Sequence, residues 1–379
     1  MQHLPERLLL GPGPSPVEPR VARAMGGPPL SHLDPAMMAM LDAIRARLAK
    51  VFRAGDGAFT FAVSGTGTSG METAVANLVA PGTRAVAVVT GYFGDRLAQV
   101  LARHGATVAR VEIEWGRACT PGQLDSFLRA MPAPPDVVAM VHAETSTGVL
   151  NPVADLCKLA SAAGAMTIVD CVTSLGAHPV DAGAWGADAV YSCTQKGLGA
   201  PSGLAPITFS KRAIEFAEGK AAEYTEHTER RSFYFDLRLL KAYWIDRKYH
   251  HTISAPLVYA LDEALEIVLE EGLEERWNRH RVNHMALVEA FGQLGMDLLP
   301  PPDERLWSLN AVKIPDGVDD AATRKQLLDR FGIEIGAGLG PLAGKIWRVG
   351  LMGNSSNARL VVLLLGALQS ALAGQKVNV

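Results

Sequence analysis

The residue best suited to covalent chemistry is Lys196, which closely follows the apolar run 189–193 and precedes a loop rich in glycine and proline. Uncharged small, β-branched and aromatic residues predict a short buried strand there. An amine at the end of an interior strand loses hydration of its charged form, so its pKa falls and it can act as a nucleophile. A lysine can also extend its ammonium to solvent along its alkyl stem, and this stretch alone favours neither interpretation.

Asp170 ends a second apolar run, 165–169, one helix-length connection before Lys196. Side chains that follow the strands of an α/β sheet lie at the edge where ligands bind. A carboxylate beside a pyridinium nitrogen and a lysine that forms a Schiff base are the two protein groups that pyridoxal 5'-phosphate (PLP) chemistry requires. Asp170 and Lys196 together therefore predict a PLP site.

A third candidate element is the stretch SGTGTSGME at 64–72, between a predicted strand (58–63) and a predicted helix (71–79). Glycines let the backbone approach an anion, and the start of a helix attracts phosphate. The same G-x-G-x-x-G pattern occurs at NAD sites, but those have an acidic residue at the end of the next strand. The strand at 85–89 ends in Thr90 and Gly91 instead. We interpret the stretch as a phosphate cradle, with a plain tight turn and an NAD site as alternatives.

Alternating elements position these groups. Apolar strands at 85–89, 106–113 and 136–142 alternate with helices at 93–104, 120–131 and 152–163, which predicts an α/β fold with a mostly parallel sheet covered on both faces. Polar residues end three strands, at Glu144–Thr145, Asp170 and Lys196, as an active site at one sheet edge requires.

A long helix is expected from about Pro256 to the region of Trp277, and the chain beyond it predicts a smaller α+β domain. We therefore expect an N-terminal arm at 1–20, a large domain at 21–271 and a small domain at 272–379. His280 and His284 share one helical face and could suggest a metal, but no acidic ligand accompanies them, so an exposed helix face and no metal site are predicted.

Composition narrows the class of protein. The 379 residues are 48% hydrophobic and 20% charged with a net charge of −3, as in a globular enzyme, and they contain no long basic run for nucleic acid or an anionic membrane. No apolar run is long enough to span a bilayer. The N-terminus does not resemble a signal peptide, the C-terminus carries no peroxisomal or retention signal, and the four cysteines form no metal or disulfide pattern. A cytoplasmic protein is expected.

At this point the chain resembles the class V aminotransferases of PLP fold type I, and among them the alanine–glyoxylate and serine–glyoxylate (or serine–pyruvate) aminotransferases. The resemblance extends over nearly the whole chain in the family's order. It rests on the segments LLLGPGPSPVEPRV, SGTGTSGMETAVANL, GYFGDR, HAETSTGVLNP, IVDCVTSLG, SCTQKGLGAPSGLAP, YHHT and GKIWRVGLMG. It implies a large domain on a mostly parallel seven-stranded sheet and a smaller C-terminal α+β domain.

The resemblance also implies residue roles. Lys196 would form the Schiff base and transfer the substrate proton, and Asp170 would keep the pyridine nitrogen protonated. Phe93 would stack on one ring face, where the family often has tryptophan, and Val172 would pack on the other, although both could simply be core residues. The other implied contacts are Thr145 near the ring hydroxyl, Thr66, Gly67, Thr68 and Gln195 at the phosphate, Tyr249 and Thr252 at the phosphate of the partner subunit in a homodimer with shared active sites, and Arg348 at the substrate carboxylate.

Some of these residues have simpler interpretations. Thr145 could be a turn cap, Tyr249 a core residue, and Arg348 a surface ion pair, although its apolar strand setting makes that less favoured. No second arginine for a distal carboxylate is identified from the sequence. This favours ping-pong transamination of small substrates, such as alanine, serine or glycine with glyoxylate or pyruvate.

Other activities stay open. Aminotransferases of 2-aminoethylphosphonate with pyruvate and of ureidoglycine with glyoxylate are alternatives, and the segment 26–35, with Ser31 and His32, is expected to border the substrate. A cysteine desulfurase is excluded because no cysteine follows Cys193. From different classes, an NAD-dependent oxidoreductase would give Lys196 no role, and an aminotransferase-like module of a transcription regulator would carry a DNA-binding domain.

Overall fold

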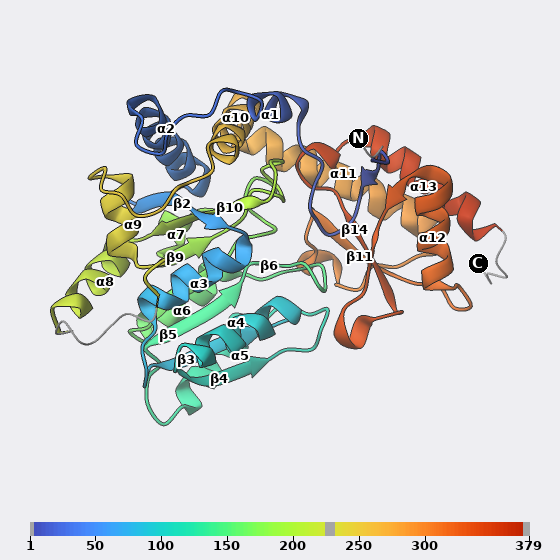
Figure 1. The fold of residues 1–379 in the computed structure, drawn as a ribbon. Coiled ribbons are helices and arrows are strands. Elements are labelled where there is room, and N and C mark those ends of the chain that lie inside the picture. The colour runs from blue at the N-terminus through green and yellow to red at the C-terminus, as the bar shows by residue number, and fades with distance from the viewer. Residues whose placement is uncertain (1–3, 224–231, 374–379) are drawn as a thin grey trace.

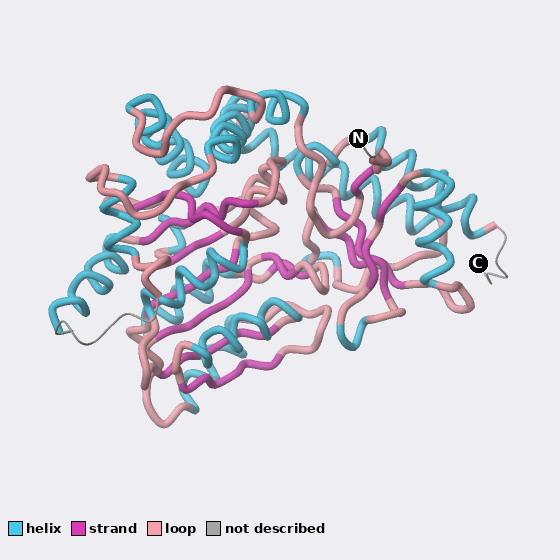
Figure 2. Tube along the Cα trace, in the orientation of Figure 1, coloured by secondary structure: helices cyan, strands magenta, loops and turns pink. Residues whose placement is uncertain are grey.

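The computed structural model describes residues 4–223 and 232–373. The first three residues of the predicted arm and the last six of the predicted small domain lie outside the described residues. The chain forms a larger body up to about α10 and a smaller body beyond it, with the N-terminal segment running between them (Figure 1). Strands form one group in each body, and helices surround both groups (Figure 2).

A seven-stranded sheet lies at the centre of the larger body, in the order β2-β10-β9-β8-β5-β3-β4. Within it only β10 runs antiparallel to its neighbours, so the prediction of a mostly parallel sheet is confirmed. The strands are β2 (Phe59–Gly65), β3 (Arg84–Val89), β4 (Thr107–Glu112), β5 (Val137–Val141), β8 (Met166–Asp170), β9 (Ala189–Tyr191) and β10 (Gly203–Phe209).

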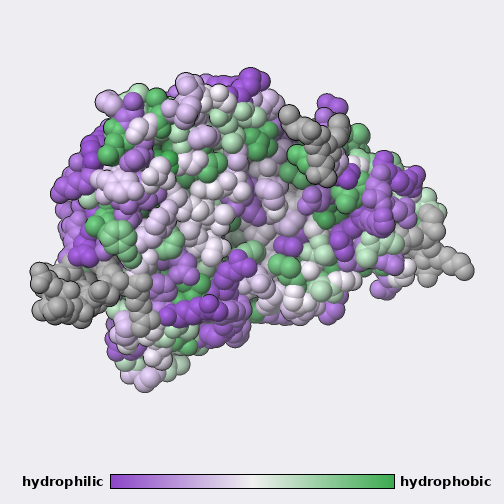
Figure 3. Space-filling model, viewed as in Figure 1, coloured by the Kyte–Doolittle hydropathy of each residue, from purple (hydrophilic) through white to green (hydrophobic). Residues whose placement is uncertain are grey.

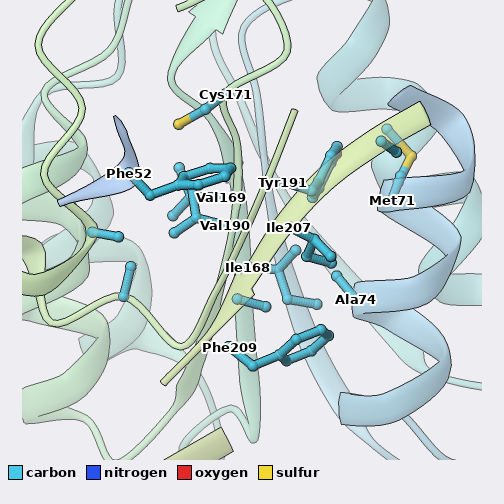
Figure 4. Packing of buried hydrophobic residues seen from close by; sticks show 14 of the residues in the cluster. Phe52, Met71, Ala74, Ile168, Val169, Cys171, Val190, Tyr191, Ile207 and Phe209 are labelled. Carbon is cyan, nitrogen blue, oxygen red and sulfur yellow. The ribbon is translucent and has the colours of Figure 1, made fainter. Parts of the chain in front are cut away.

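Helices cover both faces of this sheet because its strands are apolar on both sides. Ile168, Tyr191 and Ile207 point toward α3, whereas Val169 and Val190 point toward the other face (Figure 4). The helices of the larger body are α1 (Pro19–Ala24), α2 (Pro35–Phe52), α3 (Gly67–Leu78), α4 (Tyr92–Arg103), α5 (Pro121–Ala130), α6 (Val153–Ala162), α7 (Ala182–Trp185), α8 (Lys211–Glu223), α9 (Leu237–Trp244) and α10 (Ala255–Glu271). A short hairpin, β6 (Ala143–Glu144) with β7 (Val149–Leu150), follows β5.

The smaller body is built on an antiparallel sheet of β11 (Leu309–Lys313), β14 (Ile346–Gly350) and β13 (Gly336–Ala337), with β14 in the centre. Its helices are α11 (Leu273–Gln293), α12 (Asp320–Phe331) and α13 (Ala358–Leu372), with single 3-10 turns at Pro302–Glu304, Gly340–Leu342 and Gly353–Ser355. This body has a hydrophobic core of its own, which includes Trp347 and Leu364.

The N-terminal segment joins the two bodies. Its strand β1 (Leu8–Leu9) pairs in parallel with β12 (Ile333–Glu334) of the smaller body. Farther along, the backbone N–H of Ser15 donates to the carbonyl of Gln195 at 2.8 Å, and its hydroxyl donates to the carbonyl of Lys196 at 2.8 Å. The segment thus lies directly against the loop that carries Lys196.

One prediction about elements is wrong. The helix expected from about Pro256 to Trp277 is two helices, α10 and α11, because Gly272 between them adopts φ of 82°. The loop predicted after Lys196 is present, but the strand that follows it, β10, was not predicted; it pairs with both β2 and β9. Pro206 lies within β10, and a proline normally argues against a central strand.

The predicted exposed face of His280 and His284 is also wrong, because both side chains are buried. His280 donates from Nδ1 to the carbonyl of Arg276 at 2.7 Å and accepts the Gly353 N–H at Nε2 at 3.1 Å. His284 donates from Nδ1 to Oδ1 of Asn310 at 2.6 Å. The two histidines therefore connect α11 to the rest of the smaller body.

Polar and apolar residues are interspersed on the face of the molecule drawn in Figure 3. Among the described helices, none combines the length and the apolar character needed to cross a bilayer.

Candidate active site

A cavity of about 180 Å³ brings most of the predicted site residues together. It lies at the carboxyl ends of β2, β5, β8 and β9, the sheet edge at which α/β folds bind ligands. The predicted residues among its lining are Thr66, Gly67, Thr68, Phe93, Thr145, Asp170, Val172, Gln195 and Lys196. Four further residues line the cavity that no sequence pattern indicated as site residues: Met71, Arg96, Val141 and Ala143.

Lys196 is held in a setting that favours its neutral amine. Burial lowers the pKa of Lys196, and the nearby Arg348 guanidinium lowers it further, whereas Cys193 and Asp170 act in the opposite direction. Its Nζ donates to the carbonyl of Pro12 in the N-terminal segment. A neutral amine is the nucleophilic form of lysine, so this setting fits Schiff-base chemistry.

Asp170 ends β8 as a buried carboxyl group. Its Oδ1 accepts the N–H of Val172 at 2.8 Å, and its Oδ2 accepts the hydroxyl of Tyr191 at 2.8 Å. Burial raises the pKa of Asp170 to about 6, against these two hydrogen bonds, which lower it. A cation beside the carboxylate would offset the burial, so a protonated pyridine nitrogen fits this position.

The first turn of α3 has the features of a phosphate site. Thr66 precedes the helix without using its side chain as a cap, and the side chains of Thr66 and Thr68 are exposed. Within the described residues, Oε1 of Gln195 is buried without a hydrogen-bond partner. A Cβ added to Gly67 would lie 2.7 Å from Cγ2 of Val172, so the close approach of α3 to Val172 requires glycine. These residues fit a phosphate bound at the helix N-terminus.

Phe93 lies in the first turn of α4, and Arg96 follows one turn later. The Arg96 guanidinium lies 5.1 Å from the centre of the Phe93 ring and 5.1 Å from that of Tyr92. Sequence reasoning missed Arg96, although the i, i+3 spacing in GYFGDR places it on the helix face of Phe93. Thr145, also in the lining, is buried and shares a hydrogen bond with the hydroxyl of Thr173.

Arg348 does not line the cavity, but its charge affects Lys196, which does. It is buried on β14, where Nε donates to the carbonyl of Ala337 at 2.7 Å, and burial lowers its pKa. The structure records no ion pair between Arg348 and any described acidic residue, which disfavours the surface ion pair considered from the sequence. Its charge lowers the pKa of Lys196, so the two side chains are electrostatic neighbours.

Tyr249 and Thr252 are not part of this cavity. Both are exposed, Tyr249 by 62%, so Tyr249 is not the core residue that the sequence left possible. The Tyr249 ring lies 5.1 Å from the ring of His32, one of the two residues named for specificity. Neither Ser31 nor His32 lines the cavity.

Known proteins similar to this chain identify its family. The family model described as aminotransferase class-V matches residues 22–349. The (S)-ureidoglycine–glyoxylate transaminase of Bacillus subtilis strain 168 is 35% identical over 97% of this chain and 91% of its own length. The alanine–glyoxylate aminotransferase of Drosophila melanogaster is 33% identical over 100% of this chain and 95% of its own.

Among solved structures, the alanine–glyoxylate aminotransferase from Nostoc sp. has a TM-score of 0.93 and 44% identity, covering 98% of this chain and 96% of that one. The predicted fold, a PLP fold type I architecture, is therefore confirmed. The chain belongs to the class V aminotransferases and is a PLP-dependent transaminase.

Proposed function

We propose that this transaminase transfers the amino group of a small amino acid, alanine or serine, to a small 2-oxo acid, glyoxylate or pyruvate. The observation that carries the proposal is Arg348, a buried guanidinium that forms no ion pair with any acidic residue in the described part of the chain and is close enough to Lys196 to lower its pKa. An α-carboxylate is common to every donor and acceptor, and a guanidinium can bind it through two parallel hydrogen bonds. Glyoxylate in the names of the relatives supports the acceptor.

Lys196 and Asp170 in the cavity, and Arg348 near it, have distinct parts in this reaction. When bound, PLP supplies a ring that withdraws electrons from the substrate Cα. Asp170 would hold positive charge at the ring nitrogen, and Arg348 would orient the carboxylate. Lys196 would move the proton from the substrate Cα to C4′ of the cofactor. The lowered pKa of Lys196 suits this exchange, because a proton carrier works best when its pKa is near the working pH.

Ureidoglycine–glyoxylate transamination is the second candidate, supported by the similarity to the Bacillus subtilis enzyme. The sequence identified no second arginine near the site, but Arg96 lines the cavity. Its N–H groups suit a donor with a polar or anionic distal group, such as the ureido group or a phosphonate. Donors of this kind therefore belong in the same experiment as alanine and serine.

The test follows the visible absorption of the PLP-loaded enzyme during alternate additions of a donor and an acceptor. We expect L-alanine or L-serine to bleach the band and glyoxylate or pyruvate to restore it, with no response in Lys196→Ala. A band that responds only to ureidoglycine or 2-aminoethylphosphonate would favour the alternatives. A band indifferent to every donor would contradict the proposal.

We further propose a homodimer in which Tyr249 and Thr252 reach the cofactor phosphate of the partner subunit. Two exposed aromatic side chains support the dimer. Tyr249 lies outside the cavity of its own chain, and Phe233, in the same part of the chain, is 71% exposed. Lys196→Ala and Tyr249→Ala variants, mixed and reassociated, should regain activity, because each heterodimer contains one intact site. Activity no greater than that of the separate variants would contradict sharing.

A cytoplasmic location is also a proposal. It is supported by the four cysteines, which are free thiols as expected in a reducing compartment. Fractionation of the source cells would test it.

A further inference from the structure

Glu144 is a buried carboxylate for which the proposed reaction has no role. It lies at the end of β6, is completely inaccessible to solvent, and is not among the residues that line the cavity. Its carboxylate oxygens instead accept hydrogen bonds from the start of α4 and from Ser146. The distances are 3.2 Å to Phe93 N, 3.1 Å to Gly94 N, 3.0 Å to Ser146 N and 2.6 Å to Ser146 Oγ.

These contacts replace a missing helix cap. The residue before α4 is Gly91, which has no side chain to accept the free N–H groups of the first turn. Glu144 accepts two of them, and Oγ of Ser146 accepts a third, from Tyr92 at 2.9 Å. A Cβ at Gly91 would lie 2.4 Å from Ser146 Oγ and 2.6 Å from Glu144 Cγ, so glycine is required for the carboxylate to reach the helix.

The helix turn that Glu144 holds is the one that carries Phe93 into the cavity lining. We propose that Glu144 is a positioning residue, which fixes the first turn of α4 so that the Phe93 ring covers the cofactor. This rests on the proposed stacking role of Phe93 and adds to it: cofactor affinity depends on a carboxylate that the cofactor does not touch. The negative charge of Glu144 also faces the positive end of the α4 dipole, which stabilises the same turn.

Substitution of Glu144 by glutamine tests the proposal, because both carboxylate oxygens are occupied as acceptors. Oε1 accepts both groups of Ser146, and Oε2 accepts Phe93 N and Gly94 N. In either orientation the amide NH₂ of glutamine would face N–H or O–H donors and leave them unpaired in the interior. We expect Glu144→Gln to weaken PLP binding to the apoenzyme by about tenfold or more, the effect of leaving one or more buried donors unpaired.

The matched control is Asp188→Asn. Asp188 is also a buried carboxylate that accepts several hydrogen bonds, including Thr167 N at 2.9 Å and Ser210 Oγ at 2.9 Å, but it lies before β9, at the opposite edge of the sheet from the cavity. PLP affinity is measured by quenching of tryptophan fluorescence, which requires no amino donor, so failure of the substrate proposal does not affect the result. Asp188→Asn should lower thermal stability but leave PLP affinity within about twofold of the wild type.

A double-mutant cycle with Phe93→Ala distinguishes positioning from general destabilisation. If Glu144 acts through Phe93, Glu144→Gln should weaken PLP binding far less in the Phe93→Ala background than in the wild type. Equal losses in both backgrounds, an unchanged affinity in Glu144→Gln, or an equal loss in Asp188→Asn would each overturn the proposal. If Glu144→Gln does not fold, Ser146→Ala removes a donor and an acceptor of the same cluster and takes its place in the cycle.

Discussion

At the scale of single residues, burial shifts the pKa values of Lys196 and Asp170 in opposite directions, and both shifts favour the neutral form. It lowers the pKa of the amine and raises that of the carboxyl group to about 6, so each group is driven toward its neutral form. A lowered pKa increases the fraction of neutral amine, which is the form that does covalent chemistry. The carboxyl group regains its charge once a cation lies beside it, so binding of the pyridinium and ionisation of Asp170 favour each other.

The guanidinium of Arg348 can be tested by Arg348→Lys, which keeps the charge but loses the planar fork. We expect KM for the 2-oxo acid to rise and kcat/KM to fall about 100-fold, which corresponds to about 2.7 kcal/mol of lost carboxylate binding. Steady-state kinetics measure both. Arg324→Lys, at a partly exposed pair with Asp320 on α12, is the control and should keep wild-type kinetics. Unchanged KM in Arg348→Lys would show that the carboxylate binds elsewhere.

Residue types predicted part of the site without the structure. An amine and a carboxylate at strand ends were sufficient to select Lys196 and Asp170, because their chemistry is local. The contact of Lys196 with Pro12 joins residues 184 positions apart, and no local pattern indicates it. The roles of Phe93 and Val172 came only from family resemblance, since an apolar residue in a cavity and one in the core have the same sequence signal.

At the scale of elements, periodicity located most strands and helices to within a few residues but could not show which bodies a helix touches. Helix α11 carries Arg276, whose Nε and Nη2 donate to the carbonyls of Gly176 and Gly197 in the larger body. The same helix also pairs with Glu271 of α10 through Arg276 and Arg279. Its His280 and His284 bond to the smaller body, so polar residues are buried along with the apolar ones. Polar side chains on a helix normally predict a solvated face, and for this reason His280 and His284 were misplaced.

The first turn of α3 leads to a prediction about steric fit between Gly67 and Val172. In Gly67→Ala the new methyl group would overlap Val172, and either the helix start or Val172 must move within the cavity. We expect PLP affinity to fall at least tenfold, with thermal stability little changed because the overlap can be relieved into the cavity. Gly122→Ala, in the first turn of α5 with open space at its Cβ, is the matched control and should bind PLP normally. Similar PLP affinities in the two variants would contradict the close approach of α3 and Val172.

At the scale of the whole molecule, the two bodies are joined through the loop that follows Asp170. Trp307 N donates to Nε2 of His178 at 2.7 Å, and Oγ of Ser308 donates to the carbonyl of Thr173 at 2.9 Å. The His178 and Trp307 rings also stack, with centres 4.0 Å apart. His178 must be neutral at Nε2 to accept this bond, and burial lowers its pKa well below the ordinary value.

Several buried neutral histidines make the molecule sensitive to acid. Burial lowers the pKa from 6.5 to about 3 in His142 and His280 and to about 4 in His284. Below pH 6.5 the unfolded chain therefore binds more protons than the folded one, and each histidine removes about 1.4 kcal/mol of stability per pH unit. Asp170, Glu144 and Asp262 act in the opposite sense, because burial raises the pKa of each, but among the described residues five histidines have a lowered pKa.

We therefore expect the Tm of the apoenzyme to be nearly constant from pH 8 to 7 and to fall steeply from pH 6.5 to 5, as differential scanning fluorimetry would measure.

His284→Gln removes one of the buried imidazoles while its side-chain amide can still donate to Asn310. Below pH 6.5 this variant should lose less Tm per pH unit than the wild type, even if it is less stable at pH 7, because it has one fewer group to protonate on unfolding. If its pH slope equalled that of the wild type, protonation of His284 would not contribute to acid unfolding. A flat wild-type profile down to pH 5 would mean that the buried carboxyl groups offset the imidazoles.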